Sequence, residues 1–418
     1  MKLREALRQS AIPYLVLVVA AVVLGKYVGY LRENVWPEIP LIKSHAPSIY
    51  VTAAGLAIAG VVWLFYQGHR TKSVALQWFL GLLIATWVLH FTLALSHGDS
   101  FVLSAFFFVP VLVGIWIKTP SESDLLTTLT FMGWLVAGIL VATRLLEMLG
   151  WIPMLDVGAG LVQFEKEQYW LPLSGWLGPE GRWPGPGGHN AMTGNSGAML
   201  LVLAVAIRGR TKYVLGLIGL LTLLLTSSRN SFIGAFVGVV LVVAFGDNWL
   251  TRRIGRKSAA AALAAFFALV AAYVIVLNPG LTGRNVYWRL FVGLWQESPW
   301  VGVGSTGVSA GDPAISGTNA HNLMIDSLTR YGVFGAGLVA AVLVIALVIT
   351  IGAARFAYVL PLGIVSTFCT IGLVESDINW LGLSELILWL ILAVSLAAQA
   401  DPQEPQVDQS SAEHTWVA

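Results

Sequence analysis

The sequence has 418 residues, of which 57% are hydrophobic and only 11% are charged. Soluble globular domains carry about 25% charged residues, so the composition excludes an ordinary soluble fold and predicts a membrane protein. The formal net charge of +2 says little about partners, because the location of the charges matters more than their sum. We expect no nucleic acid as a partner. The single cysteine, Cys369, excludes an intramolecular disulfide.

Long apolar runs follow one another along most of the chain. A membrane-spanning helix needs about 17–25 residues, and by that length we expect an all-α fold with about twelve spans. The expected spans are 11–31, 47–67, 74–96, 100–117, 125–147, 191–207, 212–227, 230–246, 258–277, 332–353, 356–374 and 381–399. The first run follows basic residues as in a signal peptide, but no small-residue cleavage site follows it, so we expect a retained helix.

The positions of Lys and Arg predict how these spans are oriented. If the N-terminus is cytoplasmic, the short inner loops are basic, as the positive-inside rule requires. Their basic residues are Arg70, Lys72, Lys118, Arg208, Arg210, Lys212, Arg252, Arg253, Arg256, Lys257 and Arg355. We therefore expect one polytopic membrane domain over residues 1–400 with both termini in the cytoplasm. The polar tail, residues 401–418, is expected to be disordered.

Two outer loops are long, at about 148–190 and 278–331. The second half of the first loop is rich in Pro and Gly, which prevent a regular helix there. The second loop contains two segments with the pattern of short amphipathic helices, residues 284–297 and 320–330. We expect both to lie on the outer surface of the membrane.

Each of these two segments has recognisable helical features. In the first, Trp288, Val292 and Trp295 would share one face, while Arg289, Gly293 and Gln296 would share another. In the second, we expect Asn319 to be the N-cap and Asp326 and Arg330 to form an i,i+4 ion pair. The glycine-rich segment 302–307 lacks the context and the lysine of a P-loop, so we interpret it as a turn.

Three arginines are expected on the outer side, against the positive-inside rule. Arg229 begins the eighth span, and Arg284 and Arg289 lie in the second long loop. Each can be an anchor for lipid headgroups. Arginine also presents a fork of donors that fits phosphate oxygens. Three arginines from two distant segments favour a shared anion, and a lipid-linked diphosphate is the obvious one at this boundary.

His321 is the candidate general base. A lone histidine at a helix start is often only a structural hydrogen-bonding group, but its unperturbed pKa of about 6.5 makes a neutral base available. His189 is the other histidine in a long outer loop, and the spacing of a zinc site is absent, so we expect no metal. If His321 is structural, Asp326, Glu375 or Asp377 would be the alternatives.

Tryptophans are frequent in both long loops. They can form an interfacial belt or stack on sugar rings, and the sequence leaves both roles open. The loop tryptophans are Trp151, Trp170, Trp176, Trp183, Trp288, Trp295 and Trp300.

Several of these features together resemble the O-antigen ligase/polymerase family of polytopic glycosyltransferases, over about residues 180–340. The matching residues are Ser228-Arg229 at a helix start, Gly188-His189-Asn190, Arg289, Trp295, Pro299, Gly302-Val303-Gly304, Ala320-His321-Asn322 and Tyr331-Gly332-Val333-Phe334-Gly335. The first five spans match in topology only.

The resemblance implies a GT-C-like fold in the bacterial inner membrane, with its active site on the periplasmic side. It implies transfer of a glycan from undecaprenyl diphosphate without a metal or cofactor. Carried over by motif, His321 is the base, and Arg229 and Arg289 are catalytic residues that bind the diphosphate. The expected substrate-binding residues are Arg284, Asn322, Asn190, His189, Trp288 and Trp295.

The chain length and the large second loop favour an O-antigen ligase whose acceptor is lipid A–core. An O-antigen polymerase, which joins lipid-linked repeat units, shares the same motifs and is the nearest alternative. A secondary transporter is the alternative from another class; Glu385 is the ionisable residue that lies clearly within an expected span. Besides donor and acceptor, the expected partners are membrane lipids. The sequence specifies neither the sugar and its linkage nor the oligomeric state.

Overall fold

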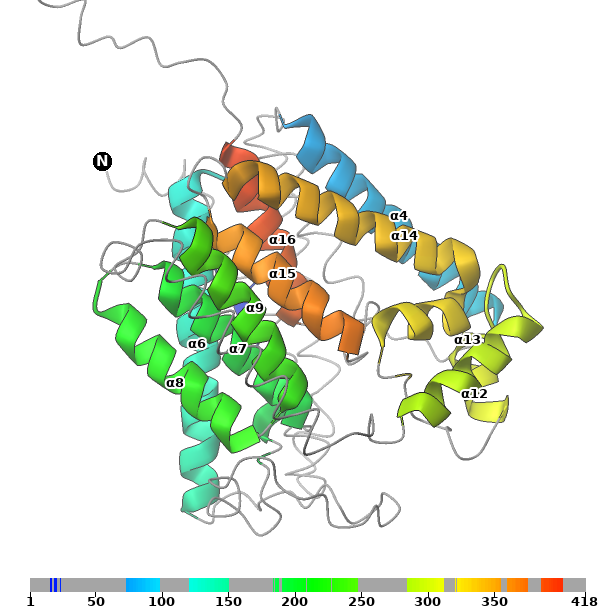
Figure 1. Ribbon diagram of the computed structural model, residues 1–418, viewed down its shortest axis with the longest axis horizontal. Helices are drawn as coiled ribbons and strands as arrows, with labels where there is room; N and C mark the ends of the chain where they lie inside the picture. The colour runs from blue at the N-terminus through cyan, green and yellow to red at the C-terminus, as the bar shows by residue number, and fades with distance from the viewer. Residues whose placement is uncertain are drawn as a thin grey trace, which may run out of the picture.

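The structure is a computed structural model. It describes residues 73–97, 120–149, 183, 185–187, 190–207, 209–226, 228–246, 284–311, 320, 322–354, 359–374 and 385–400, together with Val16, Val19, Ala20 and Val23. Over these residues all regular structure is helical and no strand occurs, which confirms the all-α prediction for this part of the chain (Figure 1).

The helices fall into two groups by position. The bundle contains α4 (Val74–Ser96), α6 (Glu122–Met148), α7 (Asn190–Ala206), α8 (Thr211–Thr226), α9 (Arg229–Phe245), α14 (Leu323–Ala354), α15 (Val359–Val374) and α16 (Glu385–Ala397). Two further helices, α12 (Arg284–Glu297) and α13 (Gly304–Gly311), lie together beside one end of α4 and α14 (Figure 1). Single 3₁₀ turns occur at η3 (Gly185–Gly187) and η4 (Ala398–Ala400).

Two of the described helices, α6 and α14, are long and apolar enough to cross a membrane, which is compatible with a membrane protein. The shorter apolar helices coincide with expected spans to within a few residues, and the bounds of α4 agree with the expected 74–96. In the first expected span, Val16, Val19, Ala20 and Val23 are helical. The expected spans 47–67, 100–117 and 258–277 lie outside the described residues.

Two helix starts show how the sequence determines these bounds. Asp124 N–H donates to Ser121 Oγ at 3.2 Å, and Ser121 N–H donates to Asp124 Oδ2 at 3.3 Å. This reciprocal capping box satisfies two backbone donors that the first turn of α6 leaves without a helical partner. Ser228 caps α9 in a similar way, because its side chain accepts the N–H of Ser231 at 3.4 Å.

Glycines allow the bundle helices to approach closely. A Cβ on Gly219 would lie 2.8 Å from the carbonyl oxygen of Gly197, where α8 crosses α7. A Cβ on Gly238 would lie 2.7 Å from the carbonyl oxygen of Gly363, where α9 crosses α15. Small residues at helix contacts are typical of membrane bundles, in which association depends on close packing.

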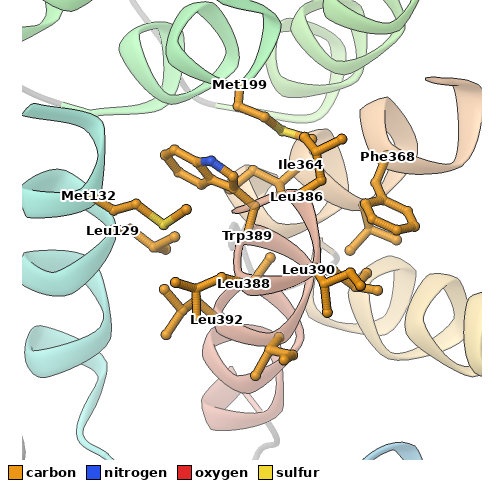
Figure 2. Packing of buried hydrophobic residues seen from close by; sticks show 14 of the residues in the cluster. Leu129, Met132, Met199, Ile364, Phe368, Leu386, Leu388, Trp389, Leu390 and Leu392 are labelled. Atoms are coloured by element: carbon orange, nitrogen blue, oxygen red, sulfur yellow. The ribbon is translucent and has the colours of Figure 1, made fainter. Parts of the chain in front are cut away.

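The core surrounds α16, every residue of which is buried. Trp389 lies at its centre, with Met132 and Leu129 of α6 on one side and Met199 of α7 above it (Figure 2). Ile364 and Phe368 of α15 pack near by (Figure 2). Apart from Glu385 and Ser395, the residues of α16 are apolar, as expected of a helix that other apolar helices enclose.

Helix α14 consists of two helices joined at Gly332, whose φ of 66° and ψ of −169° are not helical. The break divides a short surface helix from the long bundle helix, close to the expected boundary between 320–330 and 332–353. The expected start at 320 is wrong, because α14 begins at Leu323 and Asn322 caps it. Asn319, the expected cap, lies outside the described residues.

The interpretation of segment 302–307 as a turn is also wrong in part. Gly302 and Gly304 do adopt positive φ values of 73° and 71°, but Gly304 begins the helix α13. The apolar side chain of Val308 on this helix packs against Phe291 and Leu294 of α12. This tertiary contact gives the segment a buried helical face that its local glycine content does not indicate.

We expect Gly332→Ala to destabilise the fold by about 1–3 kcal/mol or more, because a non-glycine residue at positive φ is strained. The added Cβ would also lie 2.2 Å from the backbone of Trp300. The check is the thermal unfolding midpoint in detergent. Gly337→Ala in the same helix is the matched control, since no atom lies within 4 Å of its added Cβ. Equal midpoints for the two variants would contradict this reading of the break.

Candidate functional site

The predicted site residues are described to different extents. Trp288, Arg289 and Trp295 lie in α12, and Asn322 lies at the start of α14. Arg229 is the first residue of α9, Arg284 of α12 and Asn190 of α7. The structure describes the backbone of these three residues but not their side chains. His189 and His321 lie outside the described residues.

The two faces of α12 are divided as its sequence predicts. Phe291 and Leu294 are buried and form a small core with Val308 of α13 and with Ala320. The predicted polar face is exposed: Arg289, Gly293 and Gln296. The predicted tryptophan face is half-buried: Trp288, Val292 and Trp295. The side chain of Arg289 is therefore exposed, while the buried side chains on the opposite side of α12 hold the helix in place.

Trp288 connects α12 to the residue that precedes His321. Its indole Nε1–H donates to the carbonyl oxygen of Ala320 at 2.8 Å. Ala320 is completely buried, and its backbone N–H donates to Asp326 Oδ1 at 3.3 Å. Both backbone polar groups of Ala320 are thus held by side chains from two different helices.

Asn322 fixes the residue that follows His321. Its Oδ1 accepts the backbone N–H groups of Met324 and Ile325, each at 3.0 Å, which is the usual work of an N-cap. Its Nδ2 donates to the carbonyl oxygen of Leu373, near the end of α15, at 2.7 Å. These bonds give Asn322 a structural role; its expected contact with substrate stays a prediction.

The predicted ion pair between Asp326 and Arg330 is confirmed, with Asp326 Oδ2 and Arg330 Nε 3.0 Å apart. Arg330 Nη1 also donates to Ser305 Oγ of α13 at 2.6 Å. Because Asp326 Oδ1 accepts from Ala320 and Oδ2 accepts from Arg330, both of its carboxylate oxygens are engaged. These bonds give Asp326 a structural role; its role as an alternative to His321 stays a prediction.

Two tryptophans of the long loops differ in their surroundings. Trp295 Nε1–H donates to the carbonyl oxygen of Pro299 at 2.9 Å and so closes the end of its own helix. Trp183 is buried, and its Nε1–H donates to Glu147 Oε2 at 2.7 Å. Arg144 Nη1 lies 3.1 Å from the same oxygen. Trp183 is therefore a core residue, which corrects its assignment to a belt or to sugar stacking.

Two buried polar pairs, Asn195–Ser231 and Ser196–Glu385, join α7 to α9 and to α16, and together form the polar cluster. The sequence analysis singled out only Glu385 of these residues. The available signal was their position inside otherwise apolar segments, since polar residues at membrane depth are costly unless they have partners or a function. Only the separate segments were visible in the sequence, whereas the cluster arises from helix packing.

Among the described residues, no three or more His, Cys, Asp or Glu side chains are grouped so that they could hold a metal ion. The polar groups around Ala320 are instead a backbone carbonyl, an amide, an ion pair and a hydroxyl. Comparison of the sequence with protein-family models and with curated proteins found no match.

We expect Trp288→Phe to loosen the segment around Ala320, because the ring is kept while its N–H is lost. A buried hydrogen bond of this kind contributes about 0.5–1.5 kcal/mol. Hydrogen exchange measured by mass spectrometry should therefore increase in the peptide that covers residues 320–326. Trp295→Phe, which removes a bond within the α12 turn, should leave that peptide unchanged. The same exchange rates in both variants would show that Trp288 does not hold this segment.

Proposed function

We propose that the protein is an O-antigen ligase, which transfers a glycan from undecaprenyl diphosphate to a sugar hydroxyl of lipid A–core. The observation that supports this best is the 2.8 Å hydrogen bond from Trp288 Nε1–H to the carbonyl oxygen of Ala320. It joins the helix that carries Arg289 to the residue directly before His321. The proposed diphosphate-binding cation and the proposed base thus belong to segments that are joined at one point.

The junction, where α12 and the start of α14 meet at Ala320, is held by several hydrogen bonds. This supports a role in catalysis. Asn322 ties the start of α14 to α15, and Arg330 ties it to α13. Groups that hold a reactant in a fixed geometry lower the barrier of a transfer reaction because the orientation is established in advance. Side chains locked by surrounding hydrogen bonds are the usual means of achieving this.

The position of the junction in the bundle supports the periplasmic side. A Cβ on Gly304 of α13 would lie 2.6 Å from His97, directly after the end of α4. Asn322 contacts the end of α15. In the proposed topology, both of these helix ends face the periplasm, where lipid-linked glycan and lipid A–core would meet.

In the proposed reaction, the acceptor hydroxyl attacks the anomeric carbon of the donor sugar. The bond from that carbon to the diphosphate oxygen breaks, and undecaprenyl diphosphate leaves. His321 takes the hydroxyl proton, and Arg229 and Arg289 stabilise the charge of the leaving diphosphate. Displacement in line inverts the anomeric configuration. The proposed step uses no metal ion and no nucleotide.

We expect Arg289→Ala and Arg229→Ala to abolish transfer in purified, reconstituted protein, because a diphosphate needs cationic partners. Charge-assisted hydrogen bonds of this kind contribute about 1.5–3 kcal/mol each. Lysine at either position should restore activity only in part, since it lacks the planar fork. Gln296→Ala, on the same exposed face of α12 as Arg289, is the control and should retain activity. Wild-type turnover in either alanine variant would exclude the arginine clamp.

We expect His321→Gln to lower the transfer rate by about 10²–10⁴-fold, the usual range for the loss of an acid–base group. Glutamine keeps polarity and approximate size but accepts no proton at neutral pH. Donor binding should change much less, because the arginines bind the diphosphate. If His321→Gln retains most of the activity, His321 is structural and the base is another group.

Cells that lack the protein provide a separate test of ligase against polymerase. Loss of a ligase should leave glycan polymer on the lipid carrier, whereas loss of a polymerase should leave single repeat units. Accumulation of single units would overturn the ligase assignment while leaving the chemistry of the site intact.

A further inference from the structure

Helix α7 forms the buried polar cluster with two neighbouring helices, α9 and α16. Asn195 and Ser196 of α7 are each 1% exposed, and Ser231 of α9 and Glu385 of α16 are 0% exposed. Ser196 Oγ donates to the carboxylate of Glu385, which joins α7 to the first turn of α16. Buried polar groups are retained where they are paired, because desolvation without a partner costs free energy.

The Asn195–Ser231 pair of this cluster holds the first turn of α9. Ser231 Oγ donates to Asn195 Oδ1 at 2.7 Å and also lies 3.3 Å from the carbonyl oxygen of Ala191. Ser228 Oγ lies 2.7 Å from Ser231 Oγ, so a chain of hydroxyl groups can run from Ser228 through Ser231 to Asn195. Ser228 is the N-cap of α9, and Arg229 is the first residue of that helix.

A glycine on α7 brings the two helices close enough for this chain. A Cβ on Gly194 would lie 2.7 Å from Ser231 Oγ and 2.8 Å from Ser228 Cβ. It would also lie 3.0 Å from Thr226 Oγ1 at the end of α8. The start of α9 therefore has little room to shift along α7 or to turn about its own axis.

We propose that Asn195 is a positioning residue for Arg229: through Ser231 it fixes the helix start on which the arginine lies. This inference rests on the proposed function, in which Arg229 binds the donor diphosphate. Asn195 touches no substrate. Its effect on binding passes entirely through the position of the first turn of α9.

Removal of the Asn195 amide should leave the protein folded. Among the described residues, no acceptor reaches the buried Asn195 Nδ2, so Asn195→Ala removes a group without a partner along with the bond to Ser231. An N–H without a partner destabilises the folded state, and its loss offsets part of the cost of the substitution. Ser231→Ala breaks the same bond from the other side and is the second, smaller change.

The test measures the affinity of the full-length protein for undecaprenyl diphosphate in detergent. Asn195→Ala and Ser231→Ala should each bind it about tenfold more weakly, equivalent to a change of about 1.4 kcal/mol. Thr367→Val is the matched control. It removes a buried bond of 3.0 Å from α15 to the carbonyl oxygen of Gly234, farther along α9, and should leave the affinity unchanged.

A second comparison separates positioning from general structure. In an Arg229→Ala background, Asn195→Ala should weaken binding no further, because the residue through which it acts is gone. Unchanged affinity in Asn195→Ala and Ser231→Ala, or a further loss in the Arg229→Ala background, would overturn the positioning role alone. If wild-type protein binds no undecaprenyl diphosphate, the proposed function fails, and this inference fails with it.

Discussion

The arrangement of the candidate site depends on one backbone contact, where Gly302 and Gly332 lie against each other's segments. Val303 N–H donates to the carbonyl oxygen of Thr329 at 2.8 Å, and Val333 N–H donates to that of Pro299 at 2.9 Å. A Cβ on Gly302 would lie 2.4 Å from the backbone of Arg330, so glycine is required by space as well as by φ. At this contact the chain passes from the surface helix into the bundle helix of α14. The contact also holds the start of α13 beside the surface helix.

The contact connects the bundle to the surface helix of α14 and, through it, to α12 and α13. Tyr331, directly before the break, stacks on His90 of α4 with ring centroids 3.8 Å apart and planes 13° from parallel. From there the surface helix of α14 is tied to α13 by Arg330 and to α15 by Asn322. Trp288 then adds α12. These bonds connect the segments around Ala320 to the helices of the bundle, which would fix the geometry that the proposed transfer needs.

Much of this architecture follows from patterns within single segments of the sequence. The features that the sequence did not predict depend on contacts between distant segments. The bounds of α4, the two faces of α12 and the Asp326–Arg330 pair depend on periodicity within one segment, so the sequence was sufficient to predict them. Asn319 and Asn322 both satisfy the local rule for an N-cap. Asn322 also donates to the carbonyl oxygen of Leu373, 51 residues away, and no local pattern predicts this bond. The helix α13, the burial of Trp183 and the cluster around Asn195 likewise depend on contacts between distant segments.

We propose that the segments joined at Ala320 support glycan transfer by protein side chains alone. The most direct measurement is transfer by purified protein in lipid vesicles that contain undecaprenyl-diphosphate-linked glycan and lipid A–core, with EDTA present and no nucleotide. We expect glycan on lipid A–core with inverted anomeric configuration. Glycan added only to a second lipid-linked glycan would assign a polymerase. Movement of a solute without any transfer would contradict the account.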